Sequence, residues 1–506
     1  MQKFYHWSIL IITILALLPA GLYAQERNAS NSNSGANEHS QIARETHVTA
    51  NEARAIGLRF LNANTGQTRG ANELQMATAY RTAQGDTAFY VFNTANGFVM
   101  VAADRCAMPV LGYSDEGAFD VNHVPIQMQS YLQGFVEQIA YGIGHPTAVD
   151  ATTAQQWDQV RTTGQLTTSS ANVARGNNLV NTAMENNRMT KSVMMAKDSA
   201  GKMVRKEVSL SDLMNGTAEN SHIMMPTLPK NNRGSRSGSN GVAPLITANW
   251  DQGCYYNAQC PSDTDGICGH VPTGCVATAM GMIMRYWGYP AQGTGTHSYT
   301  PDGYPEQTVN FGTTTYDWDN MPDQLDENST QAQIDAVSTL LWHCGVAVEM
   351  VYGAYTSSAL DGSIPAAFHD YYGYCTPYYQ YKEDNASWLE LVKSSIDRQR
   401  PLLYFATDAT GLGGHAFVCD GYNAADQLHF NWGWGGNGNG YFAVDALNVD
   451  VFQFNNDVHA LFGIMPQSEF QLRYNIIEGG VEVTYEQPEL GTPAYYTYPD
   501  TIVIPS

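Results

Sequence analysis

The sequence contains few basic side chains. Of its 506 residues, 25 are Lys or Arg and 48 are Asp or Glu, which gives a formal net charge of −23 at pH 7. A nucleic-acid-binding protein requires a basic patch, so the composition argues against nucleic acid as a partner. The acidic excess suits solubility outside the cell, although charge alone identifies no partner. The length predicts two or more domains, because single cores rarely serve so long a chain.

Long apolar runs are absent beyond residue 24, so no later segment is expected to span a membrane. Near the start, Lys3 and His6 precede an apolar run over 9–18, and Leu-Tyr-Ala24 forms a cleavage site before Gln25. This pattern predicts a secretory signal peptide over residues 1–24. A retained membrane anchor is the alternative, but the apolar run is too short to favour it. We therefore expect an exported protein, either secreted or held at the cell surface.

Cysteine is sparse, and the eight cysteines lack the C-x-x-C spacing that is typical of zinc sites. A metal site made of Cys254, Cys260, Cys268 and His270 is therefore a disfavoured alternative. A calcium loop over 263–266 is disfavoured as well, because the full set of ligands is missing. We expect neither a metal nor another cofactor.

Three short motifs follow one another in the chain order of papain-like cysteine proteases. Cys275 follows Gly274 in the run GCVATAM, His415 lies in GGHAF, and Asn431 begins NWGWGG. In papain-like proteases the His and the Asn follow the Cys by roughly 130–150 residues, and this order is a known rule. Such a set provides a nucleophile, a base and a group that orients the base.

The chemistry of this set depends on the thiolate, because a free thiol with a pKa of about 8.5 is mostly protonated at neutral pH. Near-continuous apolar residues over 276–287 predict a buried helix that begins at Cys275. The positive end of the helix dipole and an imidazolium at His415 are both expected to lower the pKa of the thiol. Asn431 is expected to orient the His415 ring.

Further residues complete the predicted site. Gln252, in the run WDQG, is the expected side-chain donor to the oxyanion, together with the backbone N–H of Cys275. The indoles of Trp432 and Trp434 are expected to shield the Asn–His hydrogen bond from water. A single buried cysteine is usually an inert apolar residue. The joint occurrence of these residues in the correct order favours catalysis instead.

These motifs resemble the streptopain (C10) family of secreted bacterial cysteine proteases, which are made as zymogens. The resemblance implies a papain-like α+β fold, in which a helical half carries the Cys and an antiparallel sheet carries the His and Asn. It also implies substrate contacts at Gly414 and, by counting from Tyr352-Gly353, at Ser358. The likeness extends over 241–467, and the similar stretches are 250–252, 272–279, 286–290, 413–418 and 431–436.

An α+β module is expected before the catalytic region. Thr49 and Glu52 form a capping box, Asn96-Gly97 predicts a hairpin between strands over 89–101, and a helix is expected over 128–139. This arrangement resembles the streptopain propeptide, which implies an intramolecular inhibitor that covers the cleft. An unrelated accessory domain is the alternative.

The remaining organisation follows from composition and periodicity. The expected parts are a signal peptide (1–24), an inhibitory propeptide (25–145), a low-complexity linker (146–240) with activation cleavage within 225–240, a catalytic domain (241–467) and a short β-rich extension or further module (468–506). Within the catalytic domain, helices are expected over 331–343 and 388–396, and strands over 402–406, 415–420, 427–432 and 441–444.

The predicted function is that of a secreted cysteine endopeptidase, an autoprocessing zymogen that hydrolyses proteins through a thioester on Cys275. A transglutaminase-like acyltransferase is an alternative, but it would have an aspartate where Asn431 precedes Trp432. A catalytically silent binding protein is another, but it would have lost Cys275, His415 or Gln252. Because Cys275 must remain free, at most three disulfides are expected, and the sequence does not reveal their pairing.

Overall fold

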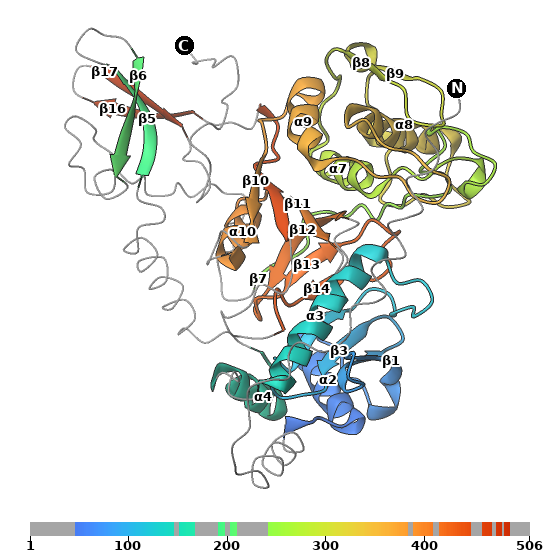
Figure 1. The fold of residues 1–506 in the computed structure, drawn as a ribbon, viewed down its shortest axis with the longest axis vertical. Helices are drawn as coiled ribbons and strands as arrows, with labels where there is room; N and C mark the ends of the chain where they lie inside the picture. Colours follow the sequence, from blue (N-terminus) through green and yellow to red (C-terminus); the bar gives the residue numbers. More distant parts are fainter. Residues whose placement is uncertain are drawn as a thin grey trace, which may run out of the picture. The chain divides into compact units, whose positions relative to one another are not determined.

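The structure is a computed structural model of the chain (Figure 1). It describes residues 46–145, 151–166, 191–197, 203–209, 241–382, 388–407, 414–446, 458–467, 472–477 and 480–485. The predicted signal peptide, the expected cleavage segment and the end of the predicted β-rich extension, over 500–506, lie outside the described residues. Among the described residues, no helix is both long and apolar enough to cross a membrane.

The first module is an antiparallel sheet with helices packed against it (Figure 1). The Thr49 side chain caps the first helix by accepting the N–H of Glu52. The predicted hairpin is confirmed, since Asn93 pairs with Phe98 across the Asn96-Gly97 turn. The elements are α2 (Ala50–Asn64), β1 (Gln75–Arg81), β2 (Thr87–Asn93), β3 (Phe98–Ala102), β4 (Val110–Ser114) and α3 (Ile126–Gly144).

The segment expected to be a linker begins with a helix, α4 (Ala151–Thr163). This helix packs against α2, and its Trp157 and Val160 are buried. The Trp157 indole donates a 2.8 Å hydrogen bond to the carbonyl of Ala107. The sequence did not predict this helix because its composition is polar: of its four buried residues, only Trp157 and Val160 are apolar. The N-terminal module therefore extends past residue 145.

The catalytic region contains a helical half around α7 (Cys275–Trp287), which begins where the sequence predicts it. Helix α7 packs against α8, and both contribute to a hydrophobic core that is separate from that of the first module. The other elements here are α8 (Gln331–Ala347), α9 (Ile364–Tyr372) and the hairpin of β8 (Thr296–Tyr299) with β9 (Gln307–Asn310).

An antiparallel sheet forms the other half, in the order β14-β13-β12-β11-β15-β10, with β7 paired to β12. The strands expected from Pro401 onward are confirmed, and α10 (Trp388–Asp397) packs on β11 and β12. The strands are β7 (Gly241–Val242), β10 (Tyr378–Tyr381), β11 (Leu402–Thr407), β12 (Gly414–Asn423), β13 (Leu428–Asn431), β14 (Gly440–Phe442) and β15 (His459–Phe462).

The sheet of the first module continues into the catalytic sheet through β4 and β14, which pair antiparallel. Tyr113 lies opposite Tyr441, and Gly112 lies opposite Phe442. A side chain at position 112 would meet the Phe442 ring at 2.8 Å, so the close approach of the two strands requires glycine. Helix α3 contacts β2 on one side of this junction and β11 and β12 on the other.

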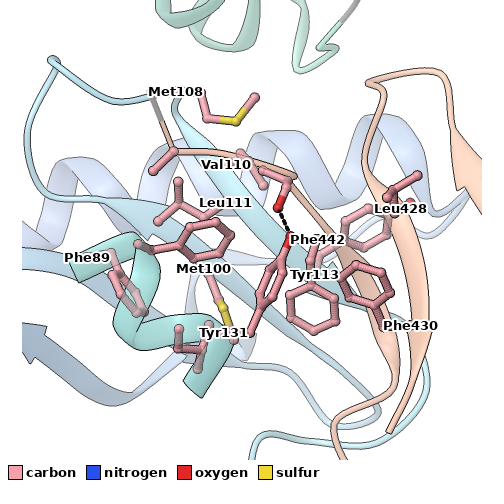
Figure 2. Packing of buried hydrophobic residues seen from close by; sticks show 14 of the residues in the cluster. Phe89, Met100, Met108, Val110, Leu111, Tyr113, Tyr131, Leu428, Phe430 and Phe442 are labelled. Atoms are coloured by element: carbon pink, nitrogen blue, oxygen red, sulfur yellow. Dashed lines mark hydrogen bonds between the residues drawn. The ribbon is translucent and has the colours of Figure 1, made fainter. Parts of the chain in front are cut away.

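Side chains of both modules share one hydrophobic core, which Figure 2 shows at the β4–β14 junction. Tyr131 on α3 packs edge-on against Phe430 and Phe442, and its hydroxyl donates to the carbonyl of Ala443 at 2.5 Å. The first module is thus part of the same sheet and core as the catalytic region.

Two further hairpins are β5 (Lys191–Lys197) with β6 (Met203–Ser209), and β16 (Leu472–Ile477) with β17 (Gly480–Tyr485).

Candidate active site

Cys275 is the first residue of α7, and the glycine before it fixes how the helix begins. Gly274 has φ 86°, in the left-handed region that favours glycine. A Cβ at position 274 would lie 2.7 Å from Sδ of Met350 and 3.1 Å from the carbonyl oxygen of Ser357. The loop around 350–358 therefore packs in close contact with Gly274, the residue that precedes Cys275.

The thiol meets the strand that carries His415. The backbone N–H of Ala416 points to Sγ of Cys275 at 3.5 Å, which places the His415–Ala416 peptide against the sulfur. Strand β12 is held by pairing of His415 with Ala406 on β11, and α7 packs on both strands. The structure thus brings together the two residues that the sequence separates by about 140 positions, as the papain-like order predicts.

The predicted lowering of the thiol pKa is not what this arrangement produces. Desolvation raises the pKa of the half-buried Cys275 thiol above its ordinary value. The backbone N–H groups of Ala416, Val276 and Cys275 act in the opposite direction and do not outweigh it. The helix N-terminus contributes as expected, but desolvation by burial has the larger effect on the pKa of the thiol.

Asn431 lies at the end of β13, opposite Val418, and its side chain is buried. Its amide nitrogen donates to the carbonyl of Ala248 at 2.9 Å, and its Oδ1 accepts the N–H of Gly433 at 3.2 Å. The first bond joins β13 to the segment that leads to Gln252, and the second joins it to the turn that follows β13. The role of Asn431 in orienting His415 stays a prediction.

Trp432 is fully buried, whereas Trp434 is partly exposed. The Trp432 indole donates to the carbonyl of Gly438 at 2.9 Å and packs 4.7 Å from the ring of Phe417. Trp434 is 37% exposed, and its indole donates to Oε1 of Gln127 on α3 at 2.7 Å. The first tryptophan supports the strand that follows His415, whereas the second binds the N-terminal module.

Gln252 is placed near the nucleophile by its backbone. Its carbonyl accepts the N–H of Thr273, two residues before Cys275, at 3.0 Å. Next to it, Cys254 forms a disulfide with Cys268, and the remaining six cysteines, all among the described residues, form no disulfide. Two of the four ligands of the alternative zinc site are therefore joined in a disulfide.

The two predicted substrate contacts lie in different surroundings. Gly414 begins β12 opposite Thr407. Ser358 is exposed, and its backbone pairs with Val351 through hydrogen bonds of 2.8 and 3.0 Å. Its neighbour Ser357, which the sequence analysis did not single out, is buried, and its hydroxyl has no partner among the described residues. Only the packing of Ser357 against Gly274 reveals its proximity to the thiol.

The N-terminal module also contacts the turn that follows Asn431. Besides the bond from Trp434 to Gln127, the Asn437 side chain donates to the carbonyl of His123 at 2.6 Å. A Cβ at Gly438 would lie 2.8 Å from Sδ of Met128. The module therefore contacts the catalytic region in two places. Its strand β4 pairs with β14, and the start of α3, with His123 just before it, contacts the 432–439 turn.

Two family models match the chain. Residues 250–442 match the Peptidase C10 family, and residues 45–139 match the Spi protease inhibitor model. The first match contains all the predicted catalytic residues, and the second covers most of the N-terminal module.

Curated relatives and a solved structure agree with these matches. The thiol protease/hemagglutinin PrtT of Porphyromonas gingivalis is 26% identical over 383 residues, which cover 74% of this chain and 36% of that protein. Streptopain of Streptococcus pyogenes is 26% identical over 402 residues, covering 74% of this chain and 80% of the relative. A fragment of Prevotella intermedia prointerpain A is 26% identical, with a TM-score of 0.52, and the match covers 77% of this chain and 98% of the fragment. The chain thus spans little more than a third of the length of PrtT.

Proposed function

Because the chain belongs to the Peptidase C10 family of cysteine-type endopeptidases, we propose that it is a secreted zymogen that cuts proteins through a thioester on Cys275. One observation supports this most strongly. The thiol of Cys275 begins a helix and lies 3.5 Å from the backbone N–H of Ala416, next to His415. A nucleophile on a rigid helix end and a base on a facing strand are the two parts that acyl transfer requires.

The proposed reaction has two steps. In the first, the thiol proton passes to His415, and Sγ of Cys275 attacks the scissile carbonyl. His415 then gives the proton to the leaving amine. The amine departs, and the acyl group remains on Cys275 as a thioester. In the second step, His415 takes a proton from water, the hydroxyl attacks the thioester, and the carboxylic product leaves as the thiol re-forms.

The neighbouring residues are assigned supporting roles. The backbone N–H of Cys275 and the Gln252 side chain are proposed to stabilise the oxyanion. Asn431 is proposed to orient the His415 ring beneath the cover of Trp432, while the backbone of Gly414 and the residue Ser358 are proposed to contact the substrate.

The N-terminal module is proposed to act as an intramolecular inhibitor and the chain's own first partner. The shared core, the β4–β14 pairing and the bond from Trp434 to Gln127 support this role. The proposed parts are a signal peptide over 1–24, a propeptide that starts at 25, a linker up to 240, a catalytic domain over 241–467 and an extension over 468–506. Strand β7 at Gly241–Val242 pairs with β12, so cleavage within 225–240 leaves the catalytic sheet intact.

Intact mass measured over time tests the proposal, with the 25–506 chain beside its Cys275→Ala variant under mild reductant. We expect only the wild type to shorten, to a product that begins within 225–240, and the variant to lose turnover by about 10⁶-fold, as when a triad nucleophile is removed. If the variant still cleaves casein after trypsin has released its propeptide, Cys275 is not the nucleophile. If neither chain shortens and the released wild type is inactive, the scaffold is catalytically silent.

A further inference from the structure

The segment between Gln252 and Cys275 is a loop closed on itself. The backbone N–H of Thr273 donates to the carbonyl of Gln252 at 3.0 Å, which closes the base of the loop directly before the helix. Within the loop, the disulfide between Cys254 and Cys268 joins two limbs of the chain. Along the chain, only Gly253 separates Cys254 from Gln252.

The first limb is anchored by buried side chains, whereas the second is held by polar contacts, such as the 2.7 Å hydrogen bond that the Tyr304 hydroxyl donates to Asp263. Tyr256, Asn257 and Cys260 on the first limb are at most 3% exposed. On the second limb, no side chain over 262–270 is buried, and Ile267 is 49% exposed. The second limb therefore has no core of its own to fix its position.

Apart from the disulfide, hydrogen bonds tie the second limb to the first, including one of 3.0 Å from the N–H of Val271 to the carbonyl of Pro261. The Asn257 side chain donates to the carbonyls of Ile267 and His270 at 2.8 and 3.3 Å, and His270 bonds the carbonyl of Cys260 at 2.8 Å. A Cβ at Gly253 would lie 3.5 Å from Ile267, so the second limb packs directly beside the residue that follows Gln252. The disulfide is the covalent link at this contact, and Cys268 is exposed to solvent reductants.

We propose that the Cys254–Cys268 disulfide is a positioning element for the Gln252 oxyanion donor, so that full turnover requires this bond to be oxidised while Cys275 is reduced. The inference rests on the proposed function, since it concerns the same oxyanion site. The mechanism is preorganisation: a donor must be held where the oxyanion develops, and a loop that is free to shift loses that alignment. The disulfide limits the conformations that the loop can reach and thereby limits those of Gln252.

The test compares the full 25–506 chain with three variants: Cys254→Ser/Cys268→Ser, Gln252→Ala and the combined triple variant. Each is processed by tagged wild-type enzyme, which is then removed, and active sites are titrated so that kcat refers to reactive Cys275. We expect Gln252→Ala to lower kcat by about 10²-fold, the usual effect of losing one oxyanion donor. The double serine variant should lower kcat by about tenfold with KM nearly unchanged, and the triple variant should be no slower than Gln252→Ala.

Each other outcome is decisive. A wild-type kcat in the double serine variant overturns the proposal, and so does a triple variant about tenfold slower than Gln252→Ala, because independent effects multiply. A normal kcat in Gln252→Ala would refute both the oxyanion role of Gln252 and the positioning role of the disulfide. The peptidase assignment would still stand if Cys275→Ala is inactive.

Reductant titration keeps the inference testable even if the double serine variant does not fold. Wild-type turnover should rise as Cys275 is reduced and then fall as Cys254 and Cys268 are reduced. Alkylation of the two cysteines, detected by mass spectrometry, reports their reduction. The double serine variant, where it folds, is the matched control and should rise to a plateau without falling. Wild-type turnover that stays constant while both cysteines become alkylated overturns the proposal.

Discussion

The indole of Trp434 donates a 2.7 Å hydrogen bond to Oε1 of Gln127, whose own amide nitrogen is buried with no partner among the described residues. This bond joins the start of α3 to the turn that follows Asn431. The turn also contains Trp432, which packs against Phe417 on β12. The N-terminal module therefore has a direct polar contact with a segment that supports the catalytic sheet.

Replacing Gln127 with Ala should therefore loosen the propeptide. One lost hydrogen bond is worth about 0.5–1.5 kcal/mol, so we expect zymogen conversion to speed up by roughly two- to tenfold. The rate of mass loss in the 25–506 chain measures this. Gln133→Ala, on the exposed side of the same helix, is the matched control and should convert at the wild-type rate. An unchanged rate in Gln127→Ala would show that the bond does not restrain the zymogen.

Gly274→Ala should damage both stability and turnover. The substitution puts a Cβ at φ 86° and 2.7 Å from Sδ of Met350, so either the helix start or the 350–358 loop must move. We expect a loss of about 1–3 kcal/mol in unfolding free energy, and turnover reduced through displacement of Cys275. Urea unfolding and peptide hydrolysis measure the two effects.

Gly288→Ala separates the backbone cost from the clash. Gly288 ends the same helix at φ 56°, and its Cβ would meet nothing within 4 Å. It should lose stability through its backbone conformation alone and keep wild-type turnover. Equal losses of turnover in the two variants would refute the link between Gly274 and the position of the thiol.

Asn431→Ala should slow hydrolysis without abolishing it, because the amide is proposed to orient His415 and does not react. The change also leaves the carbonyl of Ala248 and the N–H of Gly433 without their side-chain partner. An unpaired buried group costs about 1–3 kcal/mol, so the melting temperature should fall as well. Steady-state kinetics beside thermal unfolding separates the two effects, and a variant with lowered stability but a normal kcat would exclude the orienting role.

The buried His343 should make the stability of the protein sensitive to acid. Desolvation lowers the pKa of His343 from 6.5 to about 4, and its Nδ1 lies 3.0 Å from the hydroxyl of Tyr316. Because the pKa is lower in the folded state, the unfolded chain binds more protons below pH 6.5. Stability is therefore lost as the pH falls from 6.5 toward about 4, by up to about 3 kcal/mol.

His343→Gln removes this titration and should flatten the pH dependence of unfolding between pH 6.5 and 4. Urea titrations in the Cys275→Ala background avoid self-digestion during the measurement. His123→Gln, at an exposed ring, is the control and should keep the wild-type slope. An identical slope in His343→Gln and wild type would mean that folding does not lower the pKa of His343.

Local signals in the sequence predicted much of the fold. The Thr49 cap, the Asn96-Gly97 turn and the apolar run after Cys275 each depend on residues within one or two turns of chain, so their elements begin where expected. The α4 helix was missed because its polar composition resembles that of a linker, and only docking onto α2 through Trp157 makes it part of the core.

By itself, the sequence determined the order of Cys275, His415 and Asn431 and the residue types that the chemistry needs. Tertiary structure alone decided which distant groups meet: β4 beside β14, Ser357 against Gly274, and Cys254 with Cys268 among eight cysteines. It also decided that burial outweighs the helix N-terminus and raises the pKa of the Cys275 thiol. The physical reason is that propensities and spacing act along the chain, whereas strand pairing, desolvation and close packing depend on partners that only the folded chain brings together.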